Sequence, residues 1–415
     1  MIRLSCAILL MAAFAQAQVV EMIPEAKTMP APDWVKPGVR LTWHMMSASR
    51  QGKSLRAAPH FGADRKDQFG NKYKTNPGGS ASGQGYTEII IVAVEPKLIV
   101  WEIRSYLLPG LQNKGPATLT AVSGGTSNTP GTLAGYWMNP VALRNLLAKP
   151  AGSHGFLVGA LKHDVNGEKR DAVAVAMRDA KSHFRWVYDL NSGVLLSQGH
   201  SQTGTKGLRA TDADGTSYTG KTWGATATSF REFTQLKLPW LGTPIPDWVA
   251  GVKAIDFDGG YKMIVAGSEG VAPLPMAQRF EPVTVRKNWA LMRRTMVSGP
   301  RNFLDGGTFR GVPITPIKGP YVCGAGSPSG LWIPPAVLQR LTKGQEICAS
   351  PITEFRATVF FVGPDRGQDV CVIRWENRLQ TMDFVHDRKS GGLLRVSTHD
   401  RVLSTNRWYT FAGSR

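Results

Sequence analysis

The chain has 415 residues, of which 42% are apolar and 19% are charged, and its formal net charge is +19 at pH 7. This apolar fraction argues against a disordered chain, and no stretch beyond the N-terminus approaches the ~18 uninterrupted apolar residues of a spanning helix. Glycine (45 residues) and proline (27 residues) are frequent. Because both residues interrupt helices, the composition favours short strands and many turns over a mostly helical fold.

The first residues have the pattern of an export signal. Arg3 gives a positive start, residues 4–14 form a short apolar run, and Ala-Gln-Ala at 15–17 matches a small-x-small cleavage site. We therefore expect a signal peptide over residues 1–17 and a periplasmic or secreted protein. The alternative is that the leader is retained as an N-terminal anchor.

The most basic part of the chain lies between residues 47 and 85. Seven lysines and arginines face only Asp64 and Asp67 there, and aromatic residues stand among them. We expect this segment to be a loop insertion, which either contacts a polyanion or is a solvated glycine-rich loop. The basic residues are Arg50, Lys53, Arg56, Arg65, Lys66, Lys72 and Lys74.

The positive charge limits the class of partner. Long-range attraction favours an anionic lipid, lipoprotein or glycan. Nucleic acid is disfavoured because no known nucleic-acid-binding motif accompanies the basic segment. The charge does not choose among the envelope components, and the sequence leaves the oligomeric state open.

Three sequence landmarks occur twice along the chain and in the same order. Such an ordered set predicts one unit that is repeated, with a first domain over residues 30–240 and a second over residues 244–415. The first copy is longer between its first two landmarks, where the basic segment lies. The paired segments are 30–35 with 244–249, 135–140 with 330–335, and 189–196 with 387–394.

Within each copy the dominant signal is strand. Residues 86–94 and 98–107 are rich in isoleucine, valine, tryptophan and tyrosine, and residues 95–97 between them suit a hairpin turn. Asn166-Gly167 is a strong hairpin signal because both residues tolerate positive φ.

One short helix is expected in each copy, over residues 139–148 and 334–341. Asn139 can cap the first helix, and Pro140 and Pro335 suit a first helical turn. The sequence therefore predicts a mainly β protein of two homologous antiparallel domains, each a curved sheet or half-barrel with one short helix.

The hairpins, the Trp-x-x-x-Gly opening at Trp34 and the Asp-x-x-Ser-Gly-x-Leu-Leu segments at Asp189 and Asp387 resemble those of the bacterial periplasmic lipoprotein-carrier superfamily and related uncharacterised envelope proteins. The resemblance is distant. It implies a curved antiparallel sheet around a hydrophobic groove, and it carries over no functional residue. If each domain has such a groove, alternate strand residues would line it. The expected lining residues are Ile91, Val100 and Trp101.

None of the motif matches that could indicate catalysis is supported by the sequence around it. Residues 215–222 match the phosphate-loop pattern GxxxxGK[ST], but no buried strand precedes them and no helical stretch follows, so a nucleotide is not an expected partner. The eight histidines form no HExxH motif or close ligand pair, and the Asp-x-Asp-Gly turns at 212–215 and 256–259 lack the distal glutamate of a calcium loop. The sequence therefore predicts no catalytic residue, metal or cofactor.

The cysteines predict one disulfide. Cys323 and Cys348 flank the helix of the second copy, and an exported protein meets an oxidising compartment. We expect these two to be bridged. Cys371 stands in an apolar Val-Cys-Val-Ile run that aligns with Val173 of the first copy, so we expect a buried free thiol there.

The leading hypothesis is non-catalytic binding of an amphipathic or anionic envelope component, which could be a lipid, a lipoprotein or a glycan. A cell-envelope hydrolase with an unrecognised active site and a structural or assembly protein are the alternatives. A continuous apolar cavity would favour ligand binding, and convergent polar groups in a cleft would favour catalysis.

Overall fold

The structure of the protein is a computed structural model. It describes the chain apart from residues 1–18, 51–64, 67–71, 74–79, 110–114, 150–154, 179–181, 204–209, 212–216, 219–222, 265–271, 310–311, 329 and 415. The predicted leader, residues 1–17, therefore lies outside the described residues. Within the described part of the chain, no helix has both the length and the apolar character needed to cross a membrane.

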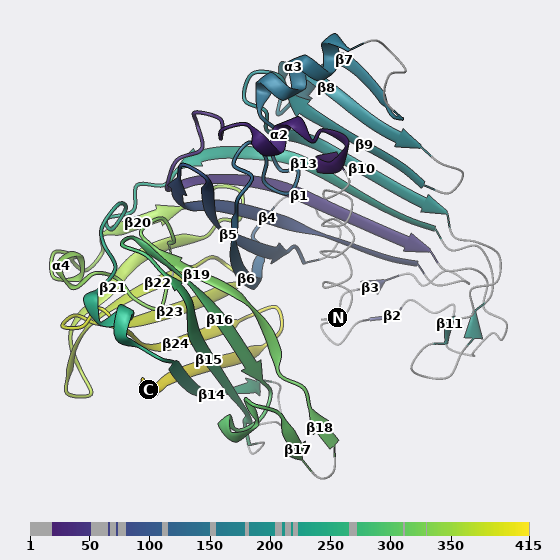
Figure 1. The fold of residues 1–415 in the computed structure, drawn as a ribbon. Coiled ribbons are helices and arrows are strands. Elements are labelled where there is room, and N and C mark those ends of the chain that lie inside the picture. Colours follow the sequence, from purple (N-terminus) through teal and green to yellow (C-terminus); the bar gives the residue numbers. More distant parts are fainter. Residues whose placement is uncertain are drawn as a thin grey trace.

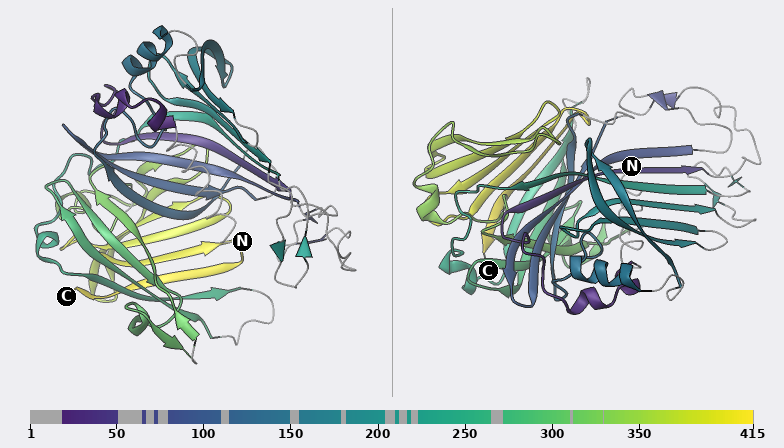
Figure 2. Two further views of the ribbon diagram at one scale, coloured as in Figure 1. Left: turned by 45° about the vertical axis from the view of Figure 1, so that its right-hand side comes forward. Right: turned by 90° about the horizontal axis from the view of Figure 1, so that it is seen from above.

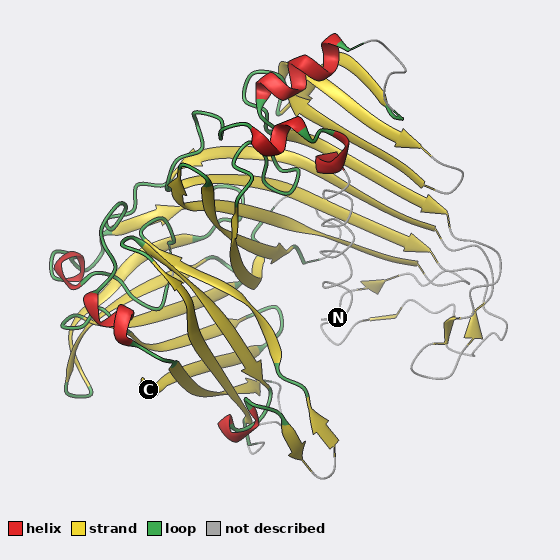
Figure 3. Ribbon diagram, viewed as in Figure 1, coloured by secondary structure: helices red, strands yellow, loops and turns green. Residues whose placement is uncertain are grey.

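Strands make up 59% and helical elements 9% of the structure, in two large antiparallel sheets that do not close. This confirms the prediction of a mainly β protein with few helices. The two sheets are seen side by side in Figure 1, and the few helices lie outside them (Figure 3).

The first sheet has nine strands. β5 alternates buried and more exposed residues over most of its length, as expected for a strand with one face on a core. β9 ends in four buried residues, because apolar clusters lie on both faces of the sheet there. In spatial order the strands are β6 (Thr118–Ser127), β5 (Leu98–Leu107), β4 (Ser80–Glu95), β1 (Val39–Arg50), β13 (Trp223–Gln235), β10 (Leu195–Thr203), β9 (Ser182–Asp189), β8 (Glu168–Arg178) and β7 (Leu157–Val165).

The second sheet has ten strands. In spatial order they are β19 (Ile317–Gly324), β16 (Trp289–Val297), β15 (Leu274–Val285), β14 (Ile255–Met263), β25 (Thr405–Ser414), β24 (Leu393–Asp400), β23 (Gln380–Asp387), β22 (Gln368–Glu376), β21 (Arg356–Asp365) and β20 (Glu346–Ala349). Its first nine strands follow the order of the first sheet along the chain and in space. Among the described strands of the second sheet, β20 is the one with no counterpart in the first sheet.

Some irregularities in the two sheets also correspond, although the shifts within β5–β6 and β21–β22 have no counterpart in the other sheet. The register of β1 with β13 shifts between Thr42 and Trp43, and that of β14 with β25 shifts between Asp256 and Phe257. The hairpins β4–β5 and β15–β16 each contain a shift as well. The equal strand order and the matching register shifts support an origin of the two halves from one repeated unit, while the domain boundaries at residues 240 and 244 stay a prediction.

Short elements complete the fold. Two strand pairs extend the first half, β2 (Arg65–Lys66) with β3 (Lys72–Tyr73) and β11 (Ala210–Thr211) with β12 (Ser217–Tyr218). The two connections that contain these pairs start at the same end of the nine-stranded sheet. Arg50, the last residue of β1, and Thr203, the last residue of β10, both pair with Trp223 at the start of β13. The remaining short elements are α2 (Glu25–Thr28), α3 (Pro140–Ala148), η1 (Asp247–Gly251), η2 (Arg301–Phe303), β17 (Gly307–Phe309), β18 (Val312–Ile314) and α4 (Pro335–Leu338).

The two predicted helices differ in length. α3 matches the expected range, and the Asn139 side chain accepts a hydrogen bond from the Val141 N–H, 2.8 Å, at its N-terminus. α4 is a single turn that ends at Leu338 and does not reach residue 341. Pro334 occupies the capping position of α4 and has no side-chain acceptor, so the helix lacks this stabilisation.

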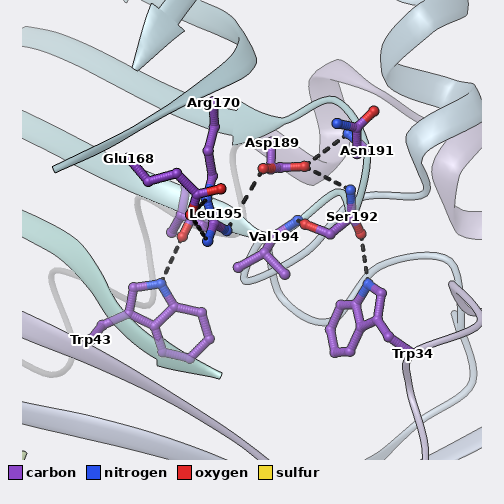
Figure 4. A network of polar contacts seen from close by, with 9 residues as sticks. All are labelled: Trp34, Trp43, Glu168, Arg170, Asp189, Asn191, Ser192, Val194 and Leu195. Atoms are coloured by element: carbon purple, nitrogen blue, oxygen red, sulfur yellow. Dashed lines mark hydrogen bonds and ion pairs between the residues drawn. The ribbon is translucent and has the colours of Figure 1, made fainter. Parts of the chain in front are cut away.

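The three landmarks of the first half come together in one cluster. Figure 4 shows two of them, with Trp34 beside the turn that contains Asp189 and Ser192. The Trp34 indole N–H donates to the Ser192 carbonyl oxygen, 2.7 Å away, in the turn between β9 and β10. The Trp34 and Trp137 rings meet edge to face with their centroids 5.4 Å apart, and Trp137 forms an isolated β-bridge with Val194. We call this arrangement of Trp34, Trp137 and residues 189–194 the first clasp.

The second half contains the same arrangement, the second clasp. The Trp248 indole N–H donates to the Ser390 carbonyl oxygen, 2.8 Å away, and the Trp248 and Trp332 rings meet edge to face at 6.0 Å. Trp332 forms an isolated β-bridge with Gly392. Residues far apart in sequence thus repeat one geometry in both halves, with the tryptophans in core packing.

The turn of the first clasp depends on an aspartate and a glycine. The Asp189 carboxylate accepts hydrogen bonds from the Asn191 and Ser192 N–H groups, 2.8 and 2.7 Å. Gly193 has φ +76°, and a Cβ there would lie 1.9 Å from the Met138 carbonyl oxygen. Only glycine fits this close approach of two backbone segments.

The two sheets pack together through corresponding edges. β6 of the first sheet runs beside β19 of the second. Tyr86, Ile90 and Tyr106 of the first sheet share one apolar cluster with the inner-face residues Val359 and Ile373 of the second. Figure 2 shows the strands of both sheets extending away from this shared zone. The inner core is therefore built jointly by the two halves.

Candidate functional site

The outer face of the second sheet has an apolar floor. Phe361, Val372 and Val385 lie in one cross-strand row on β21, β22 and β23. They form a cluster with Val370 and Leu394 that is separate from the inner core. Ile373, the neighbour of Val372, belongs to the inner core, because successive strand residues point to opposite faces.

Two adjoining hollows lie over this floor. The larger, about 310 Å³, is lined by Phe360, Phe361, Pro364, Asp365, Val372, Asp383, Val385, Arg395 and Ser397. The smaller, about 160 Å³, is lined by Asp365, Arg366, Gln368, Val370, Val385, Leu394, Arg395, Thr410 and Phe411. Because both share Asp365, Val385 and Arg395, we treat them as one surface, the outer groove.

An ion pair crosses the outer groove. The Arg395 guanidinium on β24 lies 3.0 Å from the Asp365 carboxylate at the end of β21. Strands β22 and β23 lie between these two strands, so the pair spans the apolar floor that Val370 and Val385 provide. Both side chains are about one third exposed, at 26% for Arg395 and 36% for Asp365. Water screens such a pair, and its partners can exchange.

A second arginine borders the larger hollow. The Arg374 guanidinium donates to both Asp383 carboxylate oxygens, 2.7 and 2.9 Å, and this hydrogen bonding raises the pKa of Arg374. The same guanidinium lies 3.4 Å from the centroid of the Phe360 ring. Phe360 falls at the register shift of β21 and is 45% exposed, so an aromatic face is presented to solvent.

This arrangement has the chemistry of an amphipathic binding surface. The floor offers apolar contact, and the two arginines offer a positive charge and paired N–H donors that suit carboxylate or phosphate groups. None of the described residues that line the two hollows is a histidine or cysteine.

A cluster of buried charges lies between the two halves. Glu102 and Arg104 on β5 are 0% and 1% exposed, and Arg104 Nε donates to Glu102 at 2.5 Å. Ser327 of the second half donates to Glu102, and the Arg104 guanidinium lies 4.6 Å from the Trp375 ring centroid. Burial alone would lower the pKa of Arg104, but the Glu102 charge raises it, so this arginine stays charged.

Glu88 extends this cluster. The Tyr106 hydroxyl donates to Glu88 at 2.6 Å, and the Ser350 hydroxyl of the second half lies 3.3 Å from the same carboxylate. Burial raises the pKa of Tyr106. Both buried carboxylates thus accept bonds from the other half, which indicates that the cluster fixes the two halves together. Alternating charges within the otherwise apolar segment 98–107 were a sequence signal for it.

The expected groove residues lie apart from the outer groove. Ile91 and Trp101 pair across β4 and β5 and belong to one cluster of the first half. Val100 belongs to another cluster, where it meets Trp289 and Val322 of the second half. Ile91 and Val100 are fully buried. The structure therefore brings two of the three side chains together and points the third at the neighbouring sheet.

The predicted basic loop lies largely outside the described residues, where Lys53, Arg56 and Lys74 fall. Only the backbone positions of four further residues are given. Arg50 ends β1, Arg65 and Lys66 form β2, and Lys72 begins β3. Polyanion binding by this segment stays a prediction.

The predicted disulfide between Cys323 and Cys348 is wrong for this structure. Both residues are free thiols, and they lie on β19 and β20, which are the opposite edge strands of the ten-stranded sheet. Proximity to the same helix in sequence did not place them together. Cys371 is a buried free thiol, as expected. Burial raises the pKa of Cys371 to about 11 and that of Cys348 to about 11, so both are poor nucleophiles at neutral pH.

The histidines and acidic residues of the described chain form no group of three or more that could hold a metal ion. His386 is 1% exposed and lies with its ring Nδ1 3.4 Å from the Gly391 carbonyl oxygen. Tyr188 occupies the corresponding place in the first half and donates to the Gly135 carbonyl oxygen. This correspondence indicates a packing role for His386.

The sequence matches no protein-family model and no curated protein. Three solved structures are distantly similar to the chain, and all are β-rich. A DUF1329 family protein from Desulfovibrio piger is 9% identical over 54% of this chain and 92% of its own, with a TM-score of 0.15. A DUF3598 family protein of unknown function from Nostoc punctiforme is 8% identical over 92% and 100%, TM-score 0.14. Intact Ap-TbpB, with its N and C lobes, is 9% identical over 94% and 80%, TM-score 0.11.

Proposed function

We propose that the protein binds an amphipathic anionic molecule of the cell envelope in the outer groove. The observation that carries the proposal is an apolar floor that is crossed and bordered by arginines. Arg395 spans the floor, and Arg374 lies at its margin against the exposed Phe360 ring. Val372 and Val385 are only 8% and 4% exposed, so an apolar chain would lie mainly against Phe360 and Phe411, which line the groove and are 45% and 38% exposed. An anionic head group would bind the guanidinium groups.

The energetics of such binding divide between the two chemistries. Each methylene group removed from water contributes about 0.8 kcal/mol. A carboxylate or phosphate on Arg395 would replace Asp365 as the partner of the guanidinium, which exchanges one partly exposed ion pair for another. The apolar chain is therefore expected to supply most of the affinity, and the arginines the selection for negative charge.

The charge of the whole chain supports the same class of ligand. A net charge of +19 attracts anionic amphiphiles over long range, and salt weakens this attraction because exposed charges are screened beyond ~8 Å at physiological ionic strength. Location in the periplasm or outside the cell would bring the protein to such ligands. That location, and the resemblance to lipoprotein carriers, remain predictions from the sequence.

A fluorescent fatty acid and its uncharged methyl ester, titrated against the purified protein at low and high salt, test the proposal. The acid should bind more tightly than the ester and weaken as salt rises. Leu394→Lys should weaken both probes at least tenfold by interrupting the floor. The double variant Asp365→Asn with Arg395→Gln removes the crossing pair without a net charge change. It should reduce the preference for the acid, while Arg374 and the net charge of the chain still favour it.

Val283→Lys is the matched control for the lysine substitution, because Val283 is an exposed apolar residue, 53%, on β15, away from the residues that line the groove. It should leave the binding of both probes unchanged. Equal binding by the wild type and Leu394→Lys, or no binding of either probe at both salts, would overturn the proposal and favour a structural role.

A further inference from the structure

The first sheet ends at β7, whose outer edge is paired with no described strand, although helix α3 contacts β7. Among the strands that the structure describes, β7 pairs only with β8. In the second sheet the corresponding strand, β21, pairs with β22 on one side and with the additional strand β20 on the other. Among the described strands, the same position in the two sheets thus has an outer neighbour in the second half and none in the first. An open edge presents unpaired N–H and C=O groups to any strand that can reach them.

The turn of the β7–β8 hairpin fixes which backbone groups face outward. Asn166 and Gly167 have φ +53° and +91°, which is a two-residue turn closed by the hydrogen-bonded pair Val165 and Glu168. Bonded residues alternate along an antiparallel pair. The residues of β7 whose N–H and C=O groups point away from β8 are therefore Val158, Ala160, Lys162 and Asp164.

The side chains of β7 do little to protect this edge. Leu157 is 73% exposed, and the next residues, Gly159 and Ala160 among them, are small or apolar. The only charged side chains in the strand, Lys162 and Asp164, stand in its second half, and Lys162 is bound to Asp171 at 2.6 Å. The first half of the strand carries neither a proline nor a charge.

We propose that β7 pairs antiparallel with β7 of a second copy of this chain, with Leu161 at the two-fold axis. This register pairs all nine residues of the strand and sets each outward-facing residue opposite another, Val158 against Asp164 and Ala160 against Lys162. The nine-stranded sheets of the two copies would then form one continuous sheet across the dimer.

The side chains of β7 fit this register. The exposed Leu157 of one copy lies opposite Val165 of the other, and Leu161 meets its own copy. Neither Lys162 nor Asp164 faces a like charge. Moving the axis by one residue to Lys162 would set two lysines directly opposite one another, which destabilises a strand pair. In a parallel, in-register arrangement, Lys162 would lie beside Lys162 of the other copy, and Asp164 beside Asp164.

The dependence on salt distinguishes this pairing from the binding of anionic amphiphiles. Two copies with a net charge of +19 each repel one another, so screening should strengthen the dimer as salt rises. Sedimentation velocity over a concentration series at low and high salt measures this. We expect the dissociation constant of the dimer to fall as salt rises, whereas the affinity for the fatty acid weakens.

Cysteine cross-linking tests the register. The two copies of Leu161 would form a non-hydrogen-bonded pair with Cα atoms about 4.5 Å apart, which is within the range of a disulfide. Leu161→Cys should therefore form a covalent dimer under mild oxidation. Asp164→Cys is the matched control on the same strand, because its two copies would lie about 20 Å apart in this register. Wild type controls for the native thiols.

A backbone variant tests the pairing itself. Ala160→Pro removes an N–H that points away from β8, so the hairpin keeps its own bonds while the dimer loses two. We expect at least a tenfold weaker dimer with an unchanged circular dichroism spectrum and unchanged fatty-acid binding. A monomer at all concentrations and salts, or a dimer that Ala160→Pro leaves intact and Asp164→Cys cross-links as well as Leu161→Cys, would overturn the proposal.

Discussion

Replacing Gly193 by alanine tests how much the first clasp contributes to stability. The substitution adds one methyl group at φ +76°, where its Cβ would lie 1.9 Å from the Met138 carbonyl oxygen. Ordinary contact begins near 3.4 Å, so the two backbone segments would have to separate by about 1.5 Å in a close-packed region. The hydrogen bond from the Met138 N–H to the Gly193 carbonyl oxygen, 3.0 Å, joins the same two segments and would be strained.

The expected cost has two parts. The left-handed backbone costs an alanine about 1–2 kcal/mol, and each strained backbone hydrogen bond costs about 1 kcal/mol or more. We expect Gly193→Ala to lower the free energy of unfolding by about 3–5 kcal/mol. Gly167→Ala is the control, because Gly167 also has positive φ, +91°, but a Cβ there meets nothing within 4 Å. It should cost only the backbone part.

Urea unfolding followed by tryptophan fluorescence measures both variants. Gly391→Ala belongs in the same series, since a Cβ at Gly391 would lie 2.2 Å from the Ile333 carbonyl oxygen in the second clasp. Gly391→Ala should lower the free energy of unfolding by about as much as Gly193→Ala does. Equal destabilisation by Gly167→Ala and Gly193→Ala would refute the reasoning, because the close approach would then contribute nothing beyond backbone strain.

Two further predictions concern buried ionisable groups. Burial lowers the pKa of His386 to about 4 from 6.5, so the unfolded chain takes up a proton more readily. The contribution of this group to stability is complete above pH 6.5 and falls by about 1.4 kcal/mol per unit as pH drops towards 4. Thermal unfolding between pH 4 and 7 should lose this slope in His386→Tyr, and an unchanged slope would contradict it. Arg104→Met removes the charged partner of the buried Glu102, which still accepts a hydrogen bond from Ser327, and should cost about 3–5 kcal/mol. Arg104→Met with Glu102→Leu should cost less, and a larger loss in this double variant would show that the pair does not act as a unit.

The local features of the fold could be predicted from the sequence. The Asn166-Gly167 hairpin is present with both residues at positive φ, because the turn depends only on residues that are adjacent in the chain. The Asn139 cap of α3 follows from the same kind of local chemistry. The landmark tryptophans pointed to repeated core positions, since a duplicated sequence repeats its packing.

The candidate site could not be predicted in the same way. The outer groove depends on a register shift near Phe360 and on an ion pair between Asp365 and Arg395, and neither is encoded by residues close in sequence. The expected groove at Val100 ignored the packing of one sheet against the other, which turns that residue into a contact between the halves. The disulfide failed for a related reason, because spacing along the chain does not reveal opposite edges of a sheet.

The four sheet edges of the molecule show how two similar halves acquired different surfaces. β6 and β19 cover one another where the halves meet. β20 closes the far edge of the second sheet, is only four residues long, and pairs its Glu346 with Arg356 at 3.1 Å, so it presents a short edge with charges. β7 has nine residues and none of these protections in its first half. Among the described strands, β7 is therefore the one long edge without a paired outer strand, and the proposed partner is a second copy of the chain, whose strand has the matching length and charge pattern.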